Sequence, residues 1–505
     1  MLIGLVALLY RKAVRLWWIW DDPATLRLVL DRTVWQPFVD GASWPRKMFT
    51  PLLTVFFELQ SALFDLDAQR FYVLHLVVVA ATAIAVYVAF RSFVETAPAL
   101  SAAVVFLAGP ALCSIVTQLS TVHYFLAIFF AALAVIAWRR SSVLSALFYL
   151  LSLLAKEVAA PLPLVLLCLT NRKRRVLPHF VAFAVYFVWR GLVLGTFGGG
   201  YGWAVGGKDW RTLVAFPWKI LVFAGVPLVC AITVVFAIGM RSRRGWLVFL
   251  LAIVLSIAPY APMAKDVAAR FAVVPWLTFA AGFAAAVSGI QNRRLRTAIL
   301  LLIPAITLVA NRYEWAREFR YKRRMSDENR FFFYDLPANG LLRDPLLTGH
   351  DMGELNWLRT DYVRREPGGL CFYDDLYLAT SDLRGKRVWQ YDVTRRAMVE
   401  ITSDLDAILG RHQRITRTNA PLSARFRYVD GTLQWELGPY DRGQYFALFG
   451  NGIQTGEIAR HDGFRLPAAA TIALRIRYDS PDGWITYSPE LTLDLAKNPA
   501  FDWSR

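Results

Sequence analysis

The sequence predicts a multi-pass α-helical membrane protein with a soluble region after its last span. Hydrophobic residues make up 56% of the 505-residue chain, and its mean hydropathy is +0.39. These residues lie in long blocks, most of them close to the roughly 20 apolar residues that a helix needs to cross a bilayer. After residue 311 the composition turns polar, so we expect a membrane domain over residues 1–311.

About eleven apolar blocks are candidates by that length criterion. The predicted spans cover residues 2–20, 71–90, 99–117, 121–138, 142–156, 158–170, 177–196, 214–238, 246–263, 271–290 and 297–311. Arg11, Lys12 and Arg15 interrupt the first of them. No small-residue cleavage site accompanies it, so it is typical of a retained anchor rather than of a cleaved signal peptide.

Basic residues fall on alternate connections between the predicted spans. They follow the spans of even rank, at Arg91, Arg139-Arg140, 172–175, 241–244 and 293–296. Because positive loops stay in the cytoplasm, this pattern predicts an integral inner-membrane protein with a cytoplasmic N-terminus and a periplasmic or extracellular C-terminal region. The net charge of +18 is therefore distributed as orientation signals. It does not form the continuous basic face that nucleic-acid binding needs.

The first predicted outer loop, residues 21–70, is long for a connection. Loops of that length commonly carry function. It contains two amphipathic stretches, 23–38 and 51–64, that we expect to lie on the membrane surface. A glycine-rich run at 198–202 in a later outer loop is typical of a flexible segment.

The polar C-terminal part divides into two predicted regions. Residues 312–420 combine short apolar strands with a helical pattern over 398–409, which indicates a soluble α/β segment. Residues 421–505 show alternating runs separated by turn signals, and these predict an immunoglobulin-like β-sandwich. The four cysteines form no Cys-x-x-Cys or His/Cys pattern, so neither a structural zinc site nor an internal disulfide framework is indicated.

The first candidate site is the pair Asp21-Asp22, which directly follows the first apolar block. Carboxylates are unfavourable in hydrocarbon and tolerated at its edge, so a pair at the boundary of a span indicates a functional site. The alternative is structural, since Asp22 before Pro23 matches the N-cap and first position of a helix. One carboxylate explains a cap, but it does not explain two. On the functional interpretation Asp21 is a general base or an anchor for an acceptor group and Asp22 holds the turn; the structural interpretation stays open beside it. The pair also offers ligands for a divalent cation, although no other pattern demands one.

A second group of candidates carries charge at the predicted outer ends of later spans. It consists of Lys156, Glu157, Arg190, Lys265 and Arg270. Taken singly, Lys156-Glu157 is explained by an ion pair that closes a hairpin, and the other cations by side chains that extend to the interface. Together the cations form a rim on the same side as Asp21, and such a rim suits a phosphate-bearing lipid.

Two histidines complete the set of candidates. His75 lies inside an apolar span, and His123 lies near an outer connection. A lone histidine in such a place is more often a hydrogen-bonded interior residue than a ligand, and both interpretations stay open. No P-loop or Rossmann signature occurs in the required strand–helix context, so a cytoplasmic nucleotide site is not indicated.

Together these residues resemble the GT-C superfamily of integral-membrane glycosyltransferases, which use polyprenyl-phosphate sugars. The resemblance covers about residues 15–312 and is nearest to the bacterial relatives of the protein O-mannosyltransferases. It rests on Trp20-Asp21-Asp22, 49–54, 62–67 with 71–75, 154–158, and Arg270-Phe271 followed by Pro275. The soluble C-terminal region has no counterpart in that family.

The resemblance implies an enzyme that moves a sugar from a polyprenyl-phosphate-linked donor to an acceptor glycan, lipid or protein on the periplasmic side. Such a reaction belongs to cell-envelope glycan synthesis or protein glycosylation. The resemblance implies Asp21, or else Asp22, as catalytic base, and Lys156, Arg190 and Arg270 as residues that hold the donor phosphate.

The alternative class is non-enzymatic: a transporter or flippase for lipid-linked sugars, or a scaffold that presents the C-terminal region. A transporter is expected to place ionisable sites near mid-membrane and to show duplicated halves. In this sequence the charges gather at the predicted outer boundary and the halves do not repeat. Transfer is therefore favoured over transport.

Overall fold

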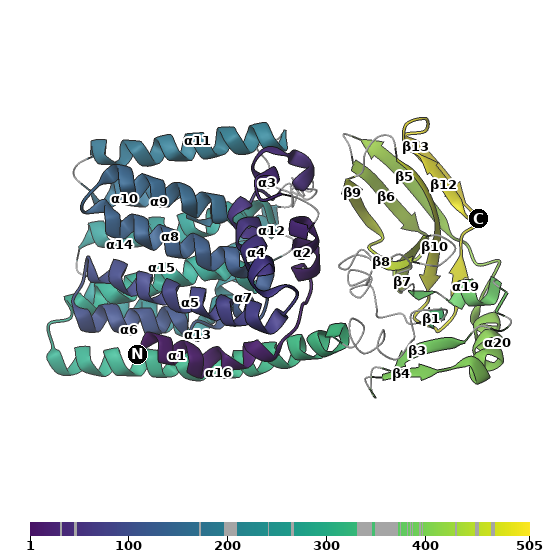
Figure 1. Cartoon of the computed structure of the whole chain (residues 1–505), viewed down its shortest axis with the longest axis horizontal. Helices are drawn as coiled ribbons and strands as arrows, with labels where there is room; N and C mark the ends of the chain where they lie inside the picture. Colours follow the sequence, from purple (N-terminus) through teal and green to yellow (C-terminus); the bar gives the residue numbers. More distant parts are fainter. Residues whose placement is uncertain are drawn as a thin grey trace. The chain divides into compact units, whose positions relative to one another are not determined.

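The structure is a computed structural model. It describes residues 1–30, 33–44, 48–170, 173–195, 210–240, 242–263, 267–330, 346–348, 372–373, 375–380, 382–383, 385, 387–392, 395, 397–429, 432–449, 454–465 and 470–505. The chain divides into two compact units, Met1–Asp327 and Glu328–Arg505. The first is a helical bundle, and the second is built mainly from β-strands (Figure 1).

The helices of the first unit follow the chain in order. They are α1 (Leu2–Tyr10), α2 (Asp22–Leu30), α3 (Gln36–Val39), α4 (Pro51–Phe64), α5 (Ala68–Arg91), α6 (Thr96–Leu107), α7 (Pro110–Val116), α8 (Val122–Trp138), α9 (Ser142–Ala155), α10 (Leu162–Leu169), α11 (Leu177–Leu194), α12 (Trp210–Ala224), α13 (Val226–Gly239), α14 (Arg243–Ile257), α15 (Val273–Gly289) and α16 (Arg293–Arg330). The predicted boundary after residue 311 falls inside α16.

Within the described residues, six helical segments are long and apolar enough to cross a membrane. They are Ala68–Arg91, Leu119–Trp138, Lys173–Leu194, Arg243–Ala261, Ala269–Gly289 and Arg293–Asp327. Two bent pairs, α6 with α7 at 57° and the later part of α12 with α13 at 93°, raise the number to eight if each pair is one span. The membrane class is thus supported, and the predicted number of eleven spans is not confirmed.

Both bends have a local cause. Gly109 and Pro110 separate α6 from α7, and Gly225, with φ +90°, precedes Val226-Pro227 between α12 and α13. Proline cannot donate the helical hydrogen bond, and glycine tolerates the positive φ that turns the chain. A run of apolar residues in the sequence therefore becomes two helices at an angle.

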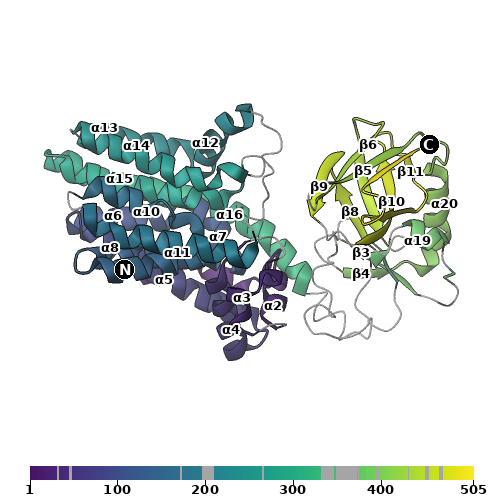
Figure 2. The same ribbon diagram turned by 90° about the horizontal axis from the view of Figure 1, so that it is seen from above.

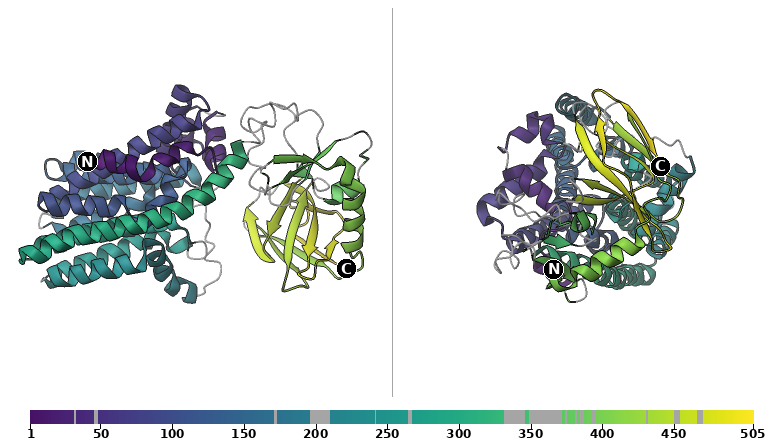
Figure 3. Two further views of the ribbon diagram at one scale, coloured as in Figure 1. Left: turned by 90° about the horizontal axis from the view of Figure 1, so that it is seen from below. Right: turned by 90° about the vertical axis from the view of Figure 1, so that its right-hand side faces the viewer.

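The predicted span over 2–20 is not one helix. α1 is followed by the 3₁₀ helix η1 (Arg11–Arg15) and then by residues 16–19, which are not helical. The nine residues of α1 rise only about 14 Å, less than half of a bilayer core. This segment instead packs along α16 (Figure 3), where Asn311 Nδ2 donates to the Tyr10 hydroxyl and Trp17 N donates to Ser326 Oγ.

Helices α2, α3 and α4 gather at one end of the bundle, which we call the loop end (Figure 2). The described basic connections meet at the opposite end. There Arg139 lies over the Phe93 ring and Arg244 Nη2 donates to the Cys168 carbonyl. A common end for these clusters is what the alternating charge pattern requires. The side of a membrane that each end faces stays a prediction.

The second unit contains two antiparallel sheets that share one core. One sheet has the order β13 (Ala500–Ser504), β5 (Ser423–Val429), β6 (Thr432–Gly438) and β9 (His461–Arg465); the other has β11 (Ile485–Tyr487), β10 (Thr471–Asp479), β7 (Gln444–Phe449) and β8 (Gln454–Ile458), with β12 (Leu491–Asp494) also paired to β10. Phe426 and Leu433 from the first sheet and Ile476 from the second lie in the same buried cluster. The alternating runs in the sequence thus form strands, while the immunoglobulin-like type stays a prediction.

A smaller sheet precedes these two. Its order is β2 (Phe372–Tyr373), β1 (Leu346–Thr348), β3 (Val388–Asp392) and β4 (Ala397–Glu400), with α19 (Asp375–Thr380) and α20 (Leu405–Ile415) in the same region. The helical pattern predicted over 398–409 is wrong in its first half. Residues 397–400 pair with β3, where Trp389 is opposite Glu400, and the helix begins only at Leu405.

Candidate functional site

Asp22, the first residue of α2, is completely buried. Its Oδ1 accepts a hydrogen bond from the Ser120 N–H at 2.7 Å, and its Oδ2 accepts one from the Ile19 N–H at 3.1 Å. The carboxylate therefore turns away from its own helix, which corrects the interpretation of Asp22 as an N-cap. It ties the first loop to η3 (Leu119–Thr121), the segment between α7 and α8.

Burial raises the pKa of Asp22 from 3.8 to about 6, because the loss of solvent penalises the charged form. Hydrogen bonds from Ser120 and Ile19 oppose this rise, and the charge of Asp21 adds to it. Asp21 itself is only half-buried, and its carbonyl accepts hydrogen bonds from the N–H and the hydroxyl of Thr25. Of the two carboxylates, Asp21 is the more accessible.

The turn that carries the two aspartates is held by α16. Trp20 has a φ of +49°, a conformation that is costly for a bulky residue unless the surroundings impose it. The ammonium group of Lys322, a completely buried residue of α16, lies over the Trp20 ring. One residue later, Arg323 Nη1 donates to the Arg15 carbonyl at 2.6 Å. The C-terminal part of α16 thus fixes the chain that leads into Asp21.

Lys156, Glu157 and Arg190 form one ion-pair cluster. Lys156 Nζ lies 3.7 Å from Glu157 Oε2, and Arg190 Nη2 lies 3.5 Å from Glu157 Oε1. Both cations are nearly removed from water, with side chains 11% and 6% exposed. The extended backbone of Lys156 ends α9 and opens the 3₁₀ helix η4 (Glu157–Ala159). One carboxylate between two cations leaves a net positive charge, which suits an anionic ligand.

Ser120 and His123 connect the aspartate turn to this cluster. His123 Nδ1 lies 2.6 Å from the carbonyl oxygen of Ser120, the residue whose N–H binds Asp22. Lys156 Nζ lies 6.0 Å from the centroid of the Tyr124 ring, next in sequence to His123. Lys156 and Arg270 both act electrostatically on His123. The structure therefore places Lys156, Glu157, Arg190 and Arg270 in the neighbourhood of His123, which Ser120 connects to the turn of Asp22.

Two predicted candidates differ from this group. His75 is buried in α5 with its ring against Phe125 and Tyr72, at centroid distances of 5.6 and 6.4 Å. These contacts favour an interior role for His75. Lys265 lies outside the described residues, as does the glycine-rich run at 198–202.

The structure adds two residues that the sequence did not single out. Ser120 sits in a short polar segment with no motif, so nothing in the sequence marked it. Tyr260, in the 3₁₀ helix η6 (Ala258–Met263), is 2% exposed and stacks on Phe271 with a centroid distance of 5.0 Å. Glu157 and Arg270 both act on it electrostatically. Its position between Pro259 and Pro262, at the end of a predicted span, was the one available signal.

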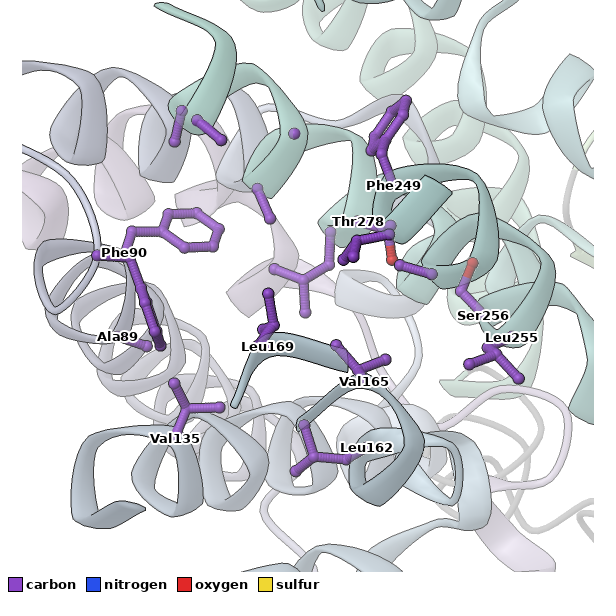
Figure 4. Close-up of a pocket in the computed structure, with 18 of the residues that line it drawn as sticks. Ala89, Phe90, Val135, Leu162, Val165, Leu169, Phe249, Leu255, Ser256 and Thr278 are labelled. Carbon is purple, nitrogen blue, oxygen red and sulfur yellow. The ribbon is translucent and has the colours of Figure 1, made fainter. Parts of the chain in front are cut away.

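An apolar cavity of about 680 Å³ lies among the helices of the bundle (Figure 4). Its lining includes Val158, which follows Glu157, and Val274, one helical turn after Arg270. Ser256, next to the last residue of α14, also lines it. The residue that follows the ion-pair cluster and the adjoining ends of α14 and α15 therefore border the cavity.

The cavity extends toward the opposite end of the bundle. Helices α5, α8, α10, α13, α14 and α15 supply its walls, and Leu162, Val165 and Leu169 of α10 follow one side of it (Figure 4). Cys168 and Arg244, which meet at the end with the basic connections, line its far part. The cavity is thus apolar along its length and has charged groups near both ends.

The donor set near Asp22 does not fit a divalent cation. Both oxygens of Asp22 accept N–H donors. Within the described part of the chain, no three His, Cys, Asp or Glu side chains group in a way that could hold a metal ion. No step of a reaction is therefore derived through a metal.

Fold and site thus define a helical protein, suited to crossing a membrane, with a buried cationic site at one end of an apolar cavity. No protein-family model matches the chain, and no curated protein matches it. The crystal structure of the Archaeoglobus fulgidus oligosaccharyltransferase in complex with Zn and sulfate is similar with a TM-score of 0.45 and 14% sequence identity, over 90% of this chain and 73% of that one. A likeness of this degree does not establish a shared fold, and nothing about the reaction is concluded from it.

Proposed function

We propose that this protein is a glycosyltransferase that moves a sugar from a polyprenyl-phosphate donor to an acceptor at the loop end of the bundle. The observation that carries the proposal is the apolar cavity lined by Val158, the residue that directly follows the buried cluster of Lys156, Glu157 and Arg190. A polyprenyl phosphate has the matching shape, with a long apolar chain and one anionic head. The chain occupies the cavity, and the head lies at the cluster.

The cations of the cluster act on the phosphate. Lys156, Arg190 and Arg270 hold it in the ground state and stabilise the charge that develops on it as the sugar departs. Glu157 keeps Lys156 and Arg190 in place through its two ion pairs. Since phosphate is already a good leaving group, these charges matter more than a general acid.

Asp21 is the general base of the proposed reaction. Both oxygens of Asp22 accept backbone N–H donors, so Asp22 fixes the turn and leaves Asp21 to meet the acceptor. Asp21 takes the proton of the acceptor hydroxyl while that oxygen forms a bond to the anomeric carbon. The bond between the anomeric carbon and the phosphate oxygen breaks, and the electron pair leaves with the phosphate.

Consumption of the donor separates this proposal from the non-enzymatic alternative. The purified full-length protein in detergent is incubated with radiolabelled polyprenyl-phosphate sugars and a membrane extract that supplies acceptors. We expect release of polyprenyl phosphate, and a higher KM for the donor in Lys156→Met. A transporter or scaffold consumes no donor. Absence of release by the wild-type protein with mannose, glucose and arabinose donors would contradict the proposal.

A further inference from the structure

Tyr260 has a buried hydroxyl with no hydrogen-bond partner among the described residues. The residue is 2% exposed, so bulk water does not satisfy this group. A buried hydroxyl without a partner is destabilising, and buried polar groups in folded proteins are nearly always paired. A hydroxyl kept in such a place points to a ligand that supplies the partner.

The surroundings of Tyr260 indicate the kind of partner. The Tyr260 ring stacks on the Phe271 ring with an interplanar angle of 26°. The guanidinium of Arg270 lies 5.3 Å from the centroid of the Phe271 ring. Tyr260 and Arg270 therefore contact the same Phe271 ring. Ser256, one turn before Tyr260, lines the apolar cavity. Tyr260 thus lies one turn beyond the cavity lining and next to the ring that also carries the guanidinium of Arg270.

We infer that the Tyr260 hydroxyl donates a hydrogen bond to the phosphate oxygen of the bound lipid, and is a binding residue of the proposed site. A hydroxyl donor and an anionic oxygen form a short, strong hydrogen bond. The cations nearby concentrate the anion at this position. The inference rests on the proposed function, because it takes its ligand from there.

Tyr260→Phe tests the inference because it removes one oxygen and keeps the ring. Tyr10→Phe is the matched control, since the Tyr10 hydroxyl is buried in the same unit and donates to the Leu107 carbonyl at 2.7 Å. Each full-length variant is purified in detergent. Its affinity is measured for undecaprenyl phosphate, for undecaprenol and for inorganic phosphate, and its thermal unfolding is followed without lipid.

We expect Tyr260→Phe to bind undecaprenyl phosphate about 10- to 100-fold more weakly than the wild type, as for loss of a hydrogen bond to a charged group. Its affinity for undecaprenol stays the same, and its unfolding temperature without lipid is equal to or higher than that of the wild type, because removal of an unpaired buried hydroxyl does not destabilise the fold. Tyr10→Phe shows the reverse, with a lower unfolding temperature and unchanged lipid affinity. We expect inorganic phosphate to compete with the lipid for the wild type and to compete less well for Tyr260→Phe. This difference would place the contact at the phosphate group of the lipid.

Three results would overturn the inference. They are equal affinity of Tyr260→Phe and wild type for undecaprenyl phosphate, an equal loss of affinity for undecaprenol, and a loss of stability without lipid like that of Tyr10→Phe. The last result would show that the hydroxyl has a partner within the protein. If the wild type itself binds no undecaprenyl phosphate, the proposed function fails, and this outcome is distinct from the other three.

Discussion

The main-chain N–H of Ser120 donates a hydrogen bond to Asp22 Oδ1 at 2.7 Å, in a buried contact between residues 98 positions apart. The Ile19 N–H binds the other carboxylate oxygen at 3.1 Å. A single side chain thus closes its own turn and fastens that turn to the segment before α8. This geometry assigns Asp22 to positioning and leaves Asp21 for the acceptor.

Asp22 is expected to make the folded protein less stable as the pH rises. Its pKa is about 6 in the folded state against 3.8 ordinarily, so between these values the folded state keeps a proton that the unfolded state has lost. This contribution is fully present below about pH 4 and is lost as the pH rises through about 6, by about 3 kcal/mol in total. Thermal unfolding in detergent from about pH 4 to 8 measures it.

The Asp22→Asn variant isolates this effect. Carboxylates such as Asp494 and Asp502, whose pKa values are lowered by hydrogen bonds from Lys497 and Arg427, contribute with the opposite sign. The difference between wild type and Asp22→Asn cancels these shared contributions. A pH dependence of stability that is identical in both proteins would remove Asp22 as its source.

Glu157→Gln is expected to lower the stability of the lipid-free protein and to increase the stabilisation that bound lipid provides. The change leaves Lys156 and Arg190 without the carboxylate between them, at a cost on the order of 2 kcal/mol, less than for a fully buried pair because the Glu157 side chain is 21% exposed. Bound undecaprenyl phosphate then replaces the missing negative charge. It should raise the unfolding temperature of the variant more than that of the wild type.

Glu95→Gln provides the control for that prediction. Glu95 pairs with Arg296 at the end of the bundle opposite the loop end, and its side chain is 70% exposed. Such surface pairs contribute little, so both stability and lipid response should match the wild type. If lipid stabilises Glu157→Gln no more than Glu95→Gln, the phosphate does not lie at the cluster.

Val165→Trp is expected to exclude long lipid chains. Val165 lines the cavity in α10, and an indole in its place fills part of the space (Figure 4). The KM for undecaprenyl-linked donor should rise on the order of tenfold, while a donor with a short prenyl chain is affected less. Leu164→Trp, at the exposed neighbouring position outside the cavity lining, serves as control. Equal effects of both variants on long and short donors would argue against a lipid in this cavity.

Trp20 and Lys322 are expected to be energetically coupled. A cation over an indole in a desolvated site contributes about 2 kcal/mol. The double variant Trp20→Leu with Lys322→Met should therefore be about 2 kcal/mol more stable than the sum of the single losses predicts. Unfolding of the wild type, both single variants and the double variant completes the cycle. Strictly additive losses would show that the two side chains do not stabilise each other.

Much of the fold could be predicted because its signals are local. Long apolar runs marked α5, α8, α11 and α15 to within a few residues, and the alternating runs over 421–505 indicated the strands of the two antiparallel sheets. The conformation of the first segment was not predicted, because it depends on packing against α16. The two bends were not predicted either, because they depend on the backbone at Gly109 and Gly225. The continuation of α16 past residue 311 also escaped, because its charged residues obscure a helix that packs along the N-terminal segment.

The site was predictable in part. The charge pattern placed Asp21, Lys156, Arg190 and Arg270 at one end of the chain's spans, and the structure pairs Lys156 and Arg190 with Glu157 and places Lys156 and Arg270 in the neighbourhood of His123. The division of roles between Asp21 and Asp22 was not predictable, since it depends on a hydrogen bond from Ser120 across the fold. Tyr260 was missed for the same reason, because its burial and its unsatisfied hydroxyl exist only in three dimensions.

The most direct test of the account compares wild type and Asp21→Asn for release of polyprenyl phosphate from a saturating radiolabelled donor. We predict that the variant inserts into the membrane, unfolds at the wild-type temperature and binds the donor as before, while its rate falls about 10²- to 10⁴-fold, the range for loss of a general base. Release at the wild-type rate by Asp21→Asn would contradict the central claim.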